Sequence, residues 1–69
     1  MMEMKWEDGF TIKVSVGKNE VVISANKEGL LSLASQLESL AKEEPGCHCH
    51  YDEYNSLEDG SSELIIEKV

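Results

Sequence analysis

The chain contains no arginine, and its six lysines face fourteen aspartate and glutamate residues, which gives 69 residues a formal charge of −8. Proteins that bind nucleic acids neutralise phosphates with basic side chains, so nucleic acid is excluded as an expected partner. Anionic membrane surfaces attract basic segments and are disfavoured for the same reason. If a charged partner exists, we expect it to be basic.

Long hydrophobic runs are also missing. The opening MMEMKWEDGF has no apolar stretch of the kind found in signal peptides, and no later segment could span a bilayer. We therefore expect a cytoplasmic protein without membrane contact. Cys47 and Cys49 should be reduced thiols there. On a strand, their side chains would lie roughly 6.5–7 Å apart, beyond the Cβ separation of about 3.5–4.5 Å that a disulfide requires.

The length predicts one small domain over residues 1–69, with an N-terminal segment at 1–9. Residues 10–16 alternate apolar and polar side chains, the turn residues Gly17, Lys18 and Asn19 follow, and residues 20–25 resume the pattern. This predicts a hairpin over 10–25. Its second strand should turn Val21, Ile23 and Ala25 toward the core.

A helix is predicted over residues 26–44, with Asn26 as N-cap and Glu28 in the first turn. Its apolar stripe should be buried and consists of Leu30, Leu31, Leu33, Ala34, Leu37, Leu40 and Ala41. The side expected to face water carries Ser32, Ser35, Glu38, Ser39 and Lys42. Pro45 and Gly46 should end the helix.

Residues 47–69 are predicted to form a second hairpin. In its first strand, alternation places Cys47, Cys49 and Tyr51 on one face and His48, His50 and Asp52 on the other. In its last strand, Leu64 and Ile66 should face the helix, while Glu63, Ile65 and Glu67 face outward. The expected fold is α+β, in the order ββαββ, with one four-stranded, mostly antiparallel sheet and one helix on one face.

The stretch GCHCHYDEYN at 46–55 admits two interpretations. His48 and His50 could share a zinc ion, with Asp52 as a third ligand or as a group that orients an imidazole. However, the chain has no C-x-x-C pair and no second Cys or His cluster, and the thiols point away from the imidazoles. We favour a core strand with buried cysteines. We expect no cofactor and no catalytic residue, and keep a metal-binding protein as the alternative.

Residues 43–67 contain eight carboxylates and no basic side chain, which suits a basic partner. Residues 22–69 resemble the immunity protein 32 family of bacterial polymorphic toxin systems. The resemblance is strongest in the residues His48, His50, Asp52, Glu53, Tyr54, Asn55, Ser56, Leu57, Glu58, Gly60, Ser61, Ser62 and Glu63. It implies a small α+β inhibitor, without catalytic activity, that binds and neutralises a toxin.

We therefore hypothesise a non-enzymatic immunity protein that binds the basic surface of a bacterial toxin. The candidate contact residues are His48, His50, Asp52, Glu53, Tyr54, Asn55 and Glu58. Tyr54 would be the aromatic anchor, and the acids would set the orientation. A homodimer that pairs through Val22 and Ile65 on the open sheet face is a third hypothesis.

Overall fold

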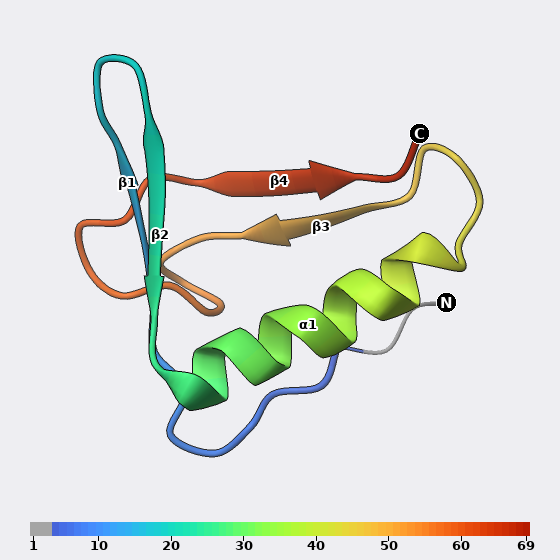
Figure 1. Ribbon diagram of the computed structural model, residues 1–69, viewed down its shortest axis with the longest axis horizontal. Coiled ribbons are helices and arrows are strands. Elements are labelled where there is room, and N and C mark those ends of the chain that lie inside the picture. Colours follow the sequence, from blue (N-terminus) through green and yellow to red (C-terminus); the bar gives the residue numbers. More distant parts are fainter. Residues whose placement is uncertain (1–3) are drawn as a thin grey trace.

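A computed structural model describes residues 4–69, and residues 1–3 of the predicted N-terminal segment lie outside the described part. The elements follow the predicted order ββαββ, as Figure 1 shows. They are β1 (Ile12–Val16), β2 (Val21–Ala25), α1 (Lys27–Ala41), β3 (His48–Tyr51) and β4 (Leu64–Glu67). The α+β class is confirmed, and both hairpins are antiparallel.

The strands form two separate two-stranded sheets instead of the single four-stranded sheet that was predicted. The reason lies in the segment that leads into β4. Glu58 donates its backbone N–H to the carbonyl of Ile12 (2.9 Å), and Ser62 donates to that of Val14 (2.9 Å). The N–H of Val14 donates to the Ser61 hydroxyl. An irregular loop thus occupies the second edge of β1, and β4 pairs with β3 alone.

The helix begins at the predicted cap, because the Asn26 side chain accepts a hydrogen bond from the N–H of Gly29 (2.8 Å). Its buried face differs from the predicted stripe. Leu33 and Leu40 are buried as expected, but Leu30 and Leu37 are 56% and 42% exposed. Leu31, Ala34 and Ala41 are exposed as well. The helix is rotated about its axis relative to the orientation that hydrophobicity alone would choose.

Ser32 and Gln36 are buried, although Ser32 was predicted to face water. Both side chains bind the N-terminal segment, which runs beside the helix. Ser32 accepts the N–H of Glu7 (2.8 Å), and Gln36 donates to the carbonyl of Lys5 (2.7 Å). The backbone N–H of Glu7 and the carbonyl of Lys5 need hydrogen-bond partners, so Ser32 and Gln36 face the N-terminal segment. With the helix in this orientation, Leu30 and Leu37 lie on its exposed side.

Seven buried side chains form the apolar core: Ile12, Val14, Leu33, Leu40, Cys49, Tyr51 and Leu57. Trp6 extends this core from the N-terminal segment. Its ring stacks on Phe10 at 4.5 Å and meets Tyr51 edge-on at 6.2 Å. The aromatic residues therefore join the N-terminal segment to β3.

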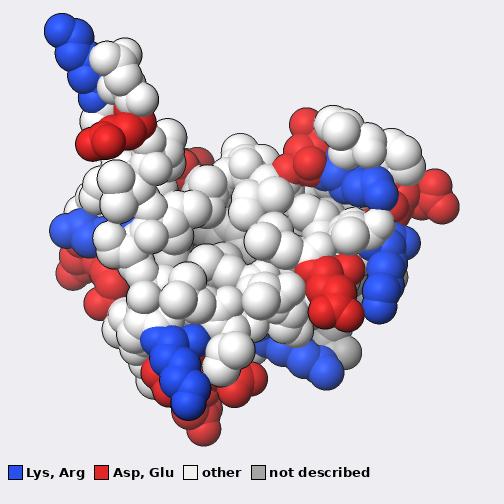
Figure 2. Space-filling view, viewed as in Figure 1, with Lys and Arg blue, Asp and Glu red and all other residues white. Residues whose placement is uncertain are grey.

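The first hairpin extends past the helix. Of the three β2 side chains predicted to be buried, only Ala25 is partly covered, whereas Val21 and Ile23 are 60% and 42% exposed. The helix starts directly after β2 and leaves the tip of the hairpin without a covering layer (Figure 1). The face seen in Figure 2 is largely uncharged and hollowed at its centre, with acidic and basic groups around the rim.

Candidate protein-binding surface

A tight turn follows β3, and Asp52 organises it. One carboxylate oxygen accepts the backbone N–H of Tyr54 (2.9 Å) and that of Asn55 (3.0 Å). The carbonyl of Asp52 accepts the N–H groups of Ser56 (3.1 Å) and Leu57 (2.8 Å). Leu57 is buried in the core, so the turn is attached to the protein at its far end. Asp52 therefore shapes this surface from within.

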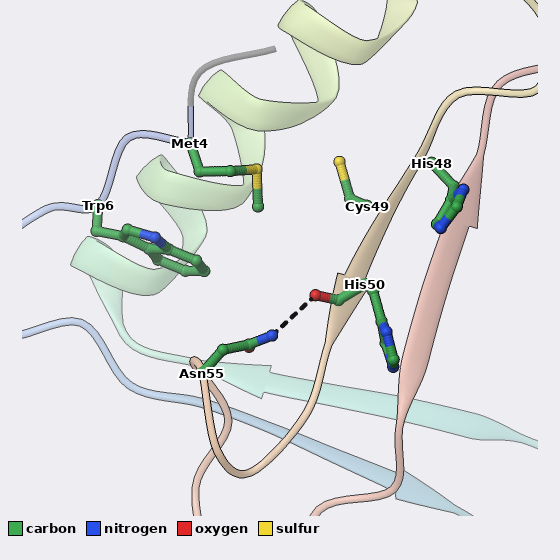
Figure 3. A pocket seen from close by; sticks show the side chains of 6 residues that line it. All are labelled: Met4, Trp6, His48, Cys49, His50 and Asn55. Carbon is green, nitrogen blue, oxygen red and sulfur yellow. Dashed lines mark hydrogen bonds between the residues drawn. The ribbon is translucent and has the colours of Figure 1, made fainter. Parts of the chain in front are cut away.

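Asn55 completes the turn. Its amide nitrogen donates to the carbonyl of His50 (3.1 Å), drawn as a dashed line in Figure 3, and its amide oxygen accepts the N–H of Asp52 (3.2 Å). The Ser56 hydroxyl also donates to that amide oxygen. Both ends of the Asn55 amide are thus hydrogen-bonded within the turn, and these bonds hold the turn closed.

Tyr54 lies at the tip of this turn and is 98% exposed. Its backbone N–H is fixed by Asp52, while its ring packs against nothing that would bury it. An aromatic ring of this size usually buries 150–250 Å² in a folded protein or at an interface. A fully exposed tyrosine on an ordered turn is a residue available for a partner.

The acidic residues of the same loop have different roles. Glu53 accepts the N–H of Gly60 (2.6 Å), where the backbone adopts a positive φ of 88°. It therefore closes the loop across seven residues. Glu58 and Asp59 are exposed, and the backbone of Glu58 is anchored on β1. These two carboxylates can meet a basic group without disturbing the loop.

His48 and His50 lie on the outward face of β3, and Cys49 and Tyr51 lie on the inward face, as alternation predicted. The His50 ring is 3.0 Å from a carboxylate oxygen of Glu63 on the neighbouring segment. Among residues 4–69, no three Cys, His, Asp or Glu side chains lie close enough together to hold a metal ion. The geometry therefore gives no support to the zinc hypothesis built on His48, His50 and Asp52.

A hollow of about 330 Å³ lies between the N-terminal segment and β3, lined by Met4, Trp6, His48, Cys49, His50 and Asn55. In Figure 3, Met4 and Trp6 approach from one side and the Cys49 thiol points toward them, while both imidazoles turn away. The side chains that enter the hollow are thus a thioether, an indole and a thiol.

Tyr51, on the same inward face of β3 as Cys49, is fully buried. Its hydroxyl donates to the side-chain oxygen of Gln36 (2.7 Å). Burial, followed by the hydrogen bond and the charge interaction with Cys49, raises the pKa of Tyr51 well above its usual range. The phenol is therefore a neutral structural donor and has no part in acid–base chemistry near neutral pH.

The free energy of unfolding should fall above about pH 10, the ordinary tyrosine pKa, by about 1.4 kcal/mol per pH unit from Tyr51 alone. Below that pH the phenol is protonated in both states, and above it only the unfolded chain releases the proton. Chemical denaturation of the wild type and of Tyr51→Phe from pH 8 to pH 12 measures this. The difference between the two stabilities should shrink as the pH rises; a difference that stays constant would contradict it.

The structure brings together Asp52, Glu53, Tyr54, Asn55 and Glu58 in one loop, with His48 and His50 on the adjoining strand. Sequence reasoning missed Glu63 as the partner of His50 and Gln36 as the buried partner of Tyr51. The strand register could have suggested Glu63, which lies one residue beyond the paired strand. No sequence signal marked Gln36 as buried.

The family model for immunity protein 32 matches residues 20–69 of the chain. The chain belongs to the immunity protein 32 family. The match begins just before β2 and includes the helix, the Asp52 turn and both strands of the second hairpin. No curated protein and no solved structure matches the chain. No helix within residues 4–69 is long and apolar enough to cross a membrane.

Proposed function

We propose that this protein is a cytoplasmic immunity protein that neutralises a cognate bacterial toxin by binding it, without catalysis. Membership of the immunity protein 32 family carries the proposal, because the match covers residues 20–69. A toxin with a basic binding surface is the partner that suits a chain of formal charge −8. Nucleic acid and membranes are not expected partners.

The proposed contact surface is the loop after β3 with the outward face of that strand. Tyr54 is its anchor, because its ring is 98% exposed on a turn already held by hydrogen bonds. A rigid aromatic residue loses little conformational entropy on binding, and tyrosine is enriched among the residues that dominate binding energy. His48, His50 and Glu58 would contact the partner around it, and Asp52, Glu53 and Asn55 would act mainly by holding the loop.

Replacing Tyr54 by alanine should weaken toxin binding by about 30-fold, the effect of losing one moderate anchor of about 2 kcal/mol. The fold should be unaffected, since the ring is almost wholly exposed. Titration calorimetry with the cognate toxin measures the dissociation constant. Val69→Ala is the matched control, because Val69 is 95% exposed and lies outside the proposed surface.

The charge part of the proposal is tested by Glu58→Lys. This variant keeps the loop intact, because only the backbone of Glu58 is used in the fold. The rate constant for association with the toxin should fall, and the difference between the rate constants of the variant and the wild type should shrink as salt is added. If Tyr54→Ala and Glu58→Lys both bind the toxin as the wild type does, this loop is not the contact surface.

A further inference from the structure

The outer edge of β2 is an unpaired row of backbone groups. In β1, the backbone groups of Ile12 and Val14 form hydrogen bonds with the loop on one side of the strand. The backbone groups of the alternate residues, Lys13 and Ser15, therefore point to the other side, toward β2. The register pairs Lys13 with Ser24 and Ser15 with Val22, so those two β2 residues face β1. The backbone groups of Val21, Ile23 and Ala25 therefore point away from the sheet, where no strand of the described chain pairs with them.

This edge has none of the features that normally prevent edge pairing. β2 reads VVISA, without a charge, a proline or a bulge. Its side chains are exposed on both faces, with Val22 at 43% and Ile23 at 42%. β2 also lies in front of β1 on the largely uncharged face of the molecule (Figures 1 and 2). An open edge of this kind is a template for another strand.

We propose that a second copy of this chain occupies the edge, with the two β2 strands antiparallel and centred on Ile23. In this register Ile23 lies opposite Ile23 of the second copy, and Val21 lies opposite Ala25 of the second copy. All of these residues have outward backbone groups, so each pair can exchange both of its hydrogen bonds. The register is self-complementary, as a two-fold axis requires.

The charged residues next to β2 are of both signs. Lys18 and Glu20 lie in the turn before it, and Lys27 and Glu28 lie in the first turn of α1 after it. These four flanking charges sum to zero, whereas the carboxylates without counter-charge lie at 43–67. The formal charge of −8 therefore opposes association much less at β2 than it would at the acidic loop.

The pairing also joins the apolar sheet faces of the two copies. A two-fold axis perpendicular to the sheet keeps both α1 helices on one side of a continuous four-stranded sheet, β1–β2–β2–β1. Val21 and Ile23 of both copies would then share one apolar face, on which they are 60% and 42% exposed in the single chain. This dimer forms through a different surface from the Tyr54 loop, and it does not depend on the proposed toxin.

Sedimentation equilibrium from micromolar to millimolar protein should show a monomer–dimer equilibrium for the wild type. Ile23→Pro should raise the dissociation constant by about 30-fold, because the central pair loses both N–H donors. The monomer should tolerate this change, since that N–H faces outward on an edge strand. Val22→Thr is the matched control and should dimerise like the wild type, because it adds no charge, keeps a β-branched side chain and has its backbone groups turned toward β1.

Amide hydrogen exchange of the wild type tests the register without any variant. The N–H groups of Val22 and Ser24 should be protected at every concentration, whereas those of Val21, Ile23 and Ala25 should gain protection only as the dimer forms. A monomer at all concentrations, with rapid exchange at these three amides, would overturn the proposal. Protection that arises only when toxin is added would also overturn it and assign the edge to the toxin.

Discussion

Gly29→Ala should destabilise the protein by about 3 kcal/mol, although alanine is the better helix former by about 1 kcal/mol. Gly29 is buried in the first turn of α1, where the helix lies directly on the first hairpin. A Cβ here would overlap the backbone carbonyl oxygen of Thr11, 3.0 Å from the Ile12 side chain and 3.1 Å from that of Ala25. The carbonyl cannot move alone, because it accepts the N–H of Asn26.

Urea denaturation followed by circular dichroism measures this effect. A chain of this size has a stability of about 3–5 kcal/mol, so the variant should be largely unfolded at room temperature. Ser35→Ala is the matched control, since it also raises helix propensity in α1 and lies at a position that is only partly buried. A Gly29→Ala protein as stable as this control would contradict the close contact between Gly29 and the Thr11 carbonyl.

Gln36→Leu should cost about 3 kcal/mol, because it leaves two polar groups without their partners. Gln36 is fully buried and connects three parts of the fold: it accepts from the Tyr51 hydroxyl on β3 and donates to the Lys5 carbonyl. Leucine fills a similar volume, so the loss reports the hydrogen bonds more than the packing. The same urea titration provides the measurement.

A double-mutant cycle with Tyr51→Phe separates these contributions. Removing both partners of the buried hydrogen bond should cost less than the sum of the single changes, because no hydroxyl is then left unsatisfied. Ser39→Ala, at a partly buried helix position without a described side-chain bond, is the control for general effects on α1. Strictly additive losses would mean that Gln36 and Tyr51 do not act as a pair.

The order of elements could be predicted from the sequence because it depends on local patterns. Alternation located all four strands, and Asn26 marked the start of the helix. The arrangement of the strands into sheets depends on contacts between segments that are distant in the sequence. Such contacts produce no local sequence pattern. Ser61 and Ser62 look like ordinary loop residues, yet they occupy the edge of β1 that a strand was expected to fill.

The orientation of the helix could not be predicted for a related reason. Hydrophobicity favours burying Leu30 and Leu37, but the N-terminal segment requires hydrogen-bond partners, which Ser32 and Gln36 supply. In the candidate surface, alternation correctly separated His50 from Cys49. Tyr54 is exposed, as an aromatic anchor should be. Alternation could not reveal that Asp52 and Asn55 are engaged in the turn, because those hydrogen bonds depend on the folded loop.

The measurement that tests the central claim most directly is titration of the cognate toxin with this protein, followed by native mass spectrometry and by toxin activity. Our account predicts a saturable, stoichiometric complex, with toxin activity lost in proportion to the amount of complex formed. Active toxin in the presence of excess protein, with no complex detected, would contradict it. Inactivation of many toxin molecules by each protein molecule would also contradict it, because that result requires catalysis.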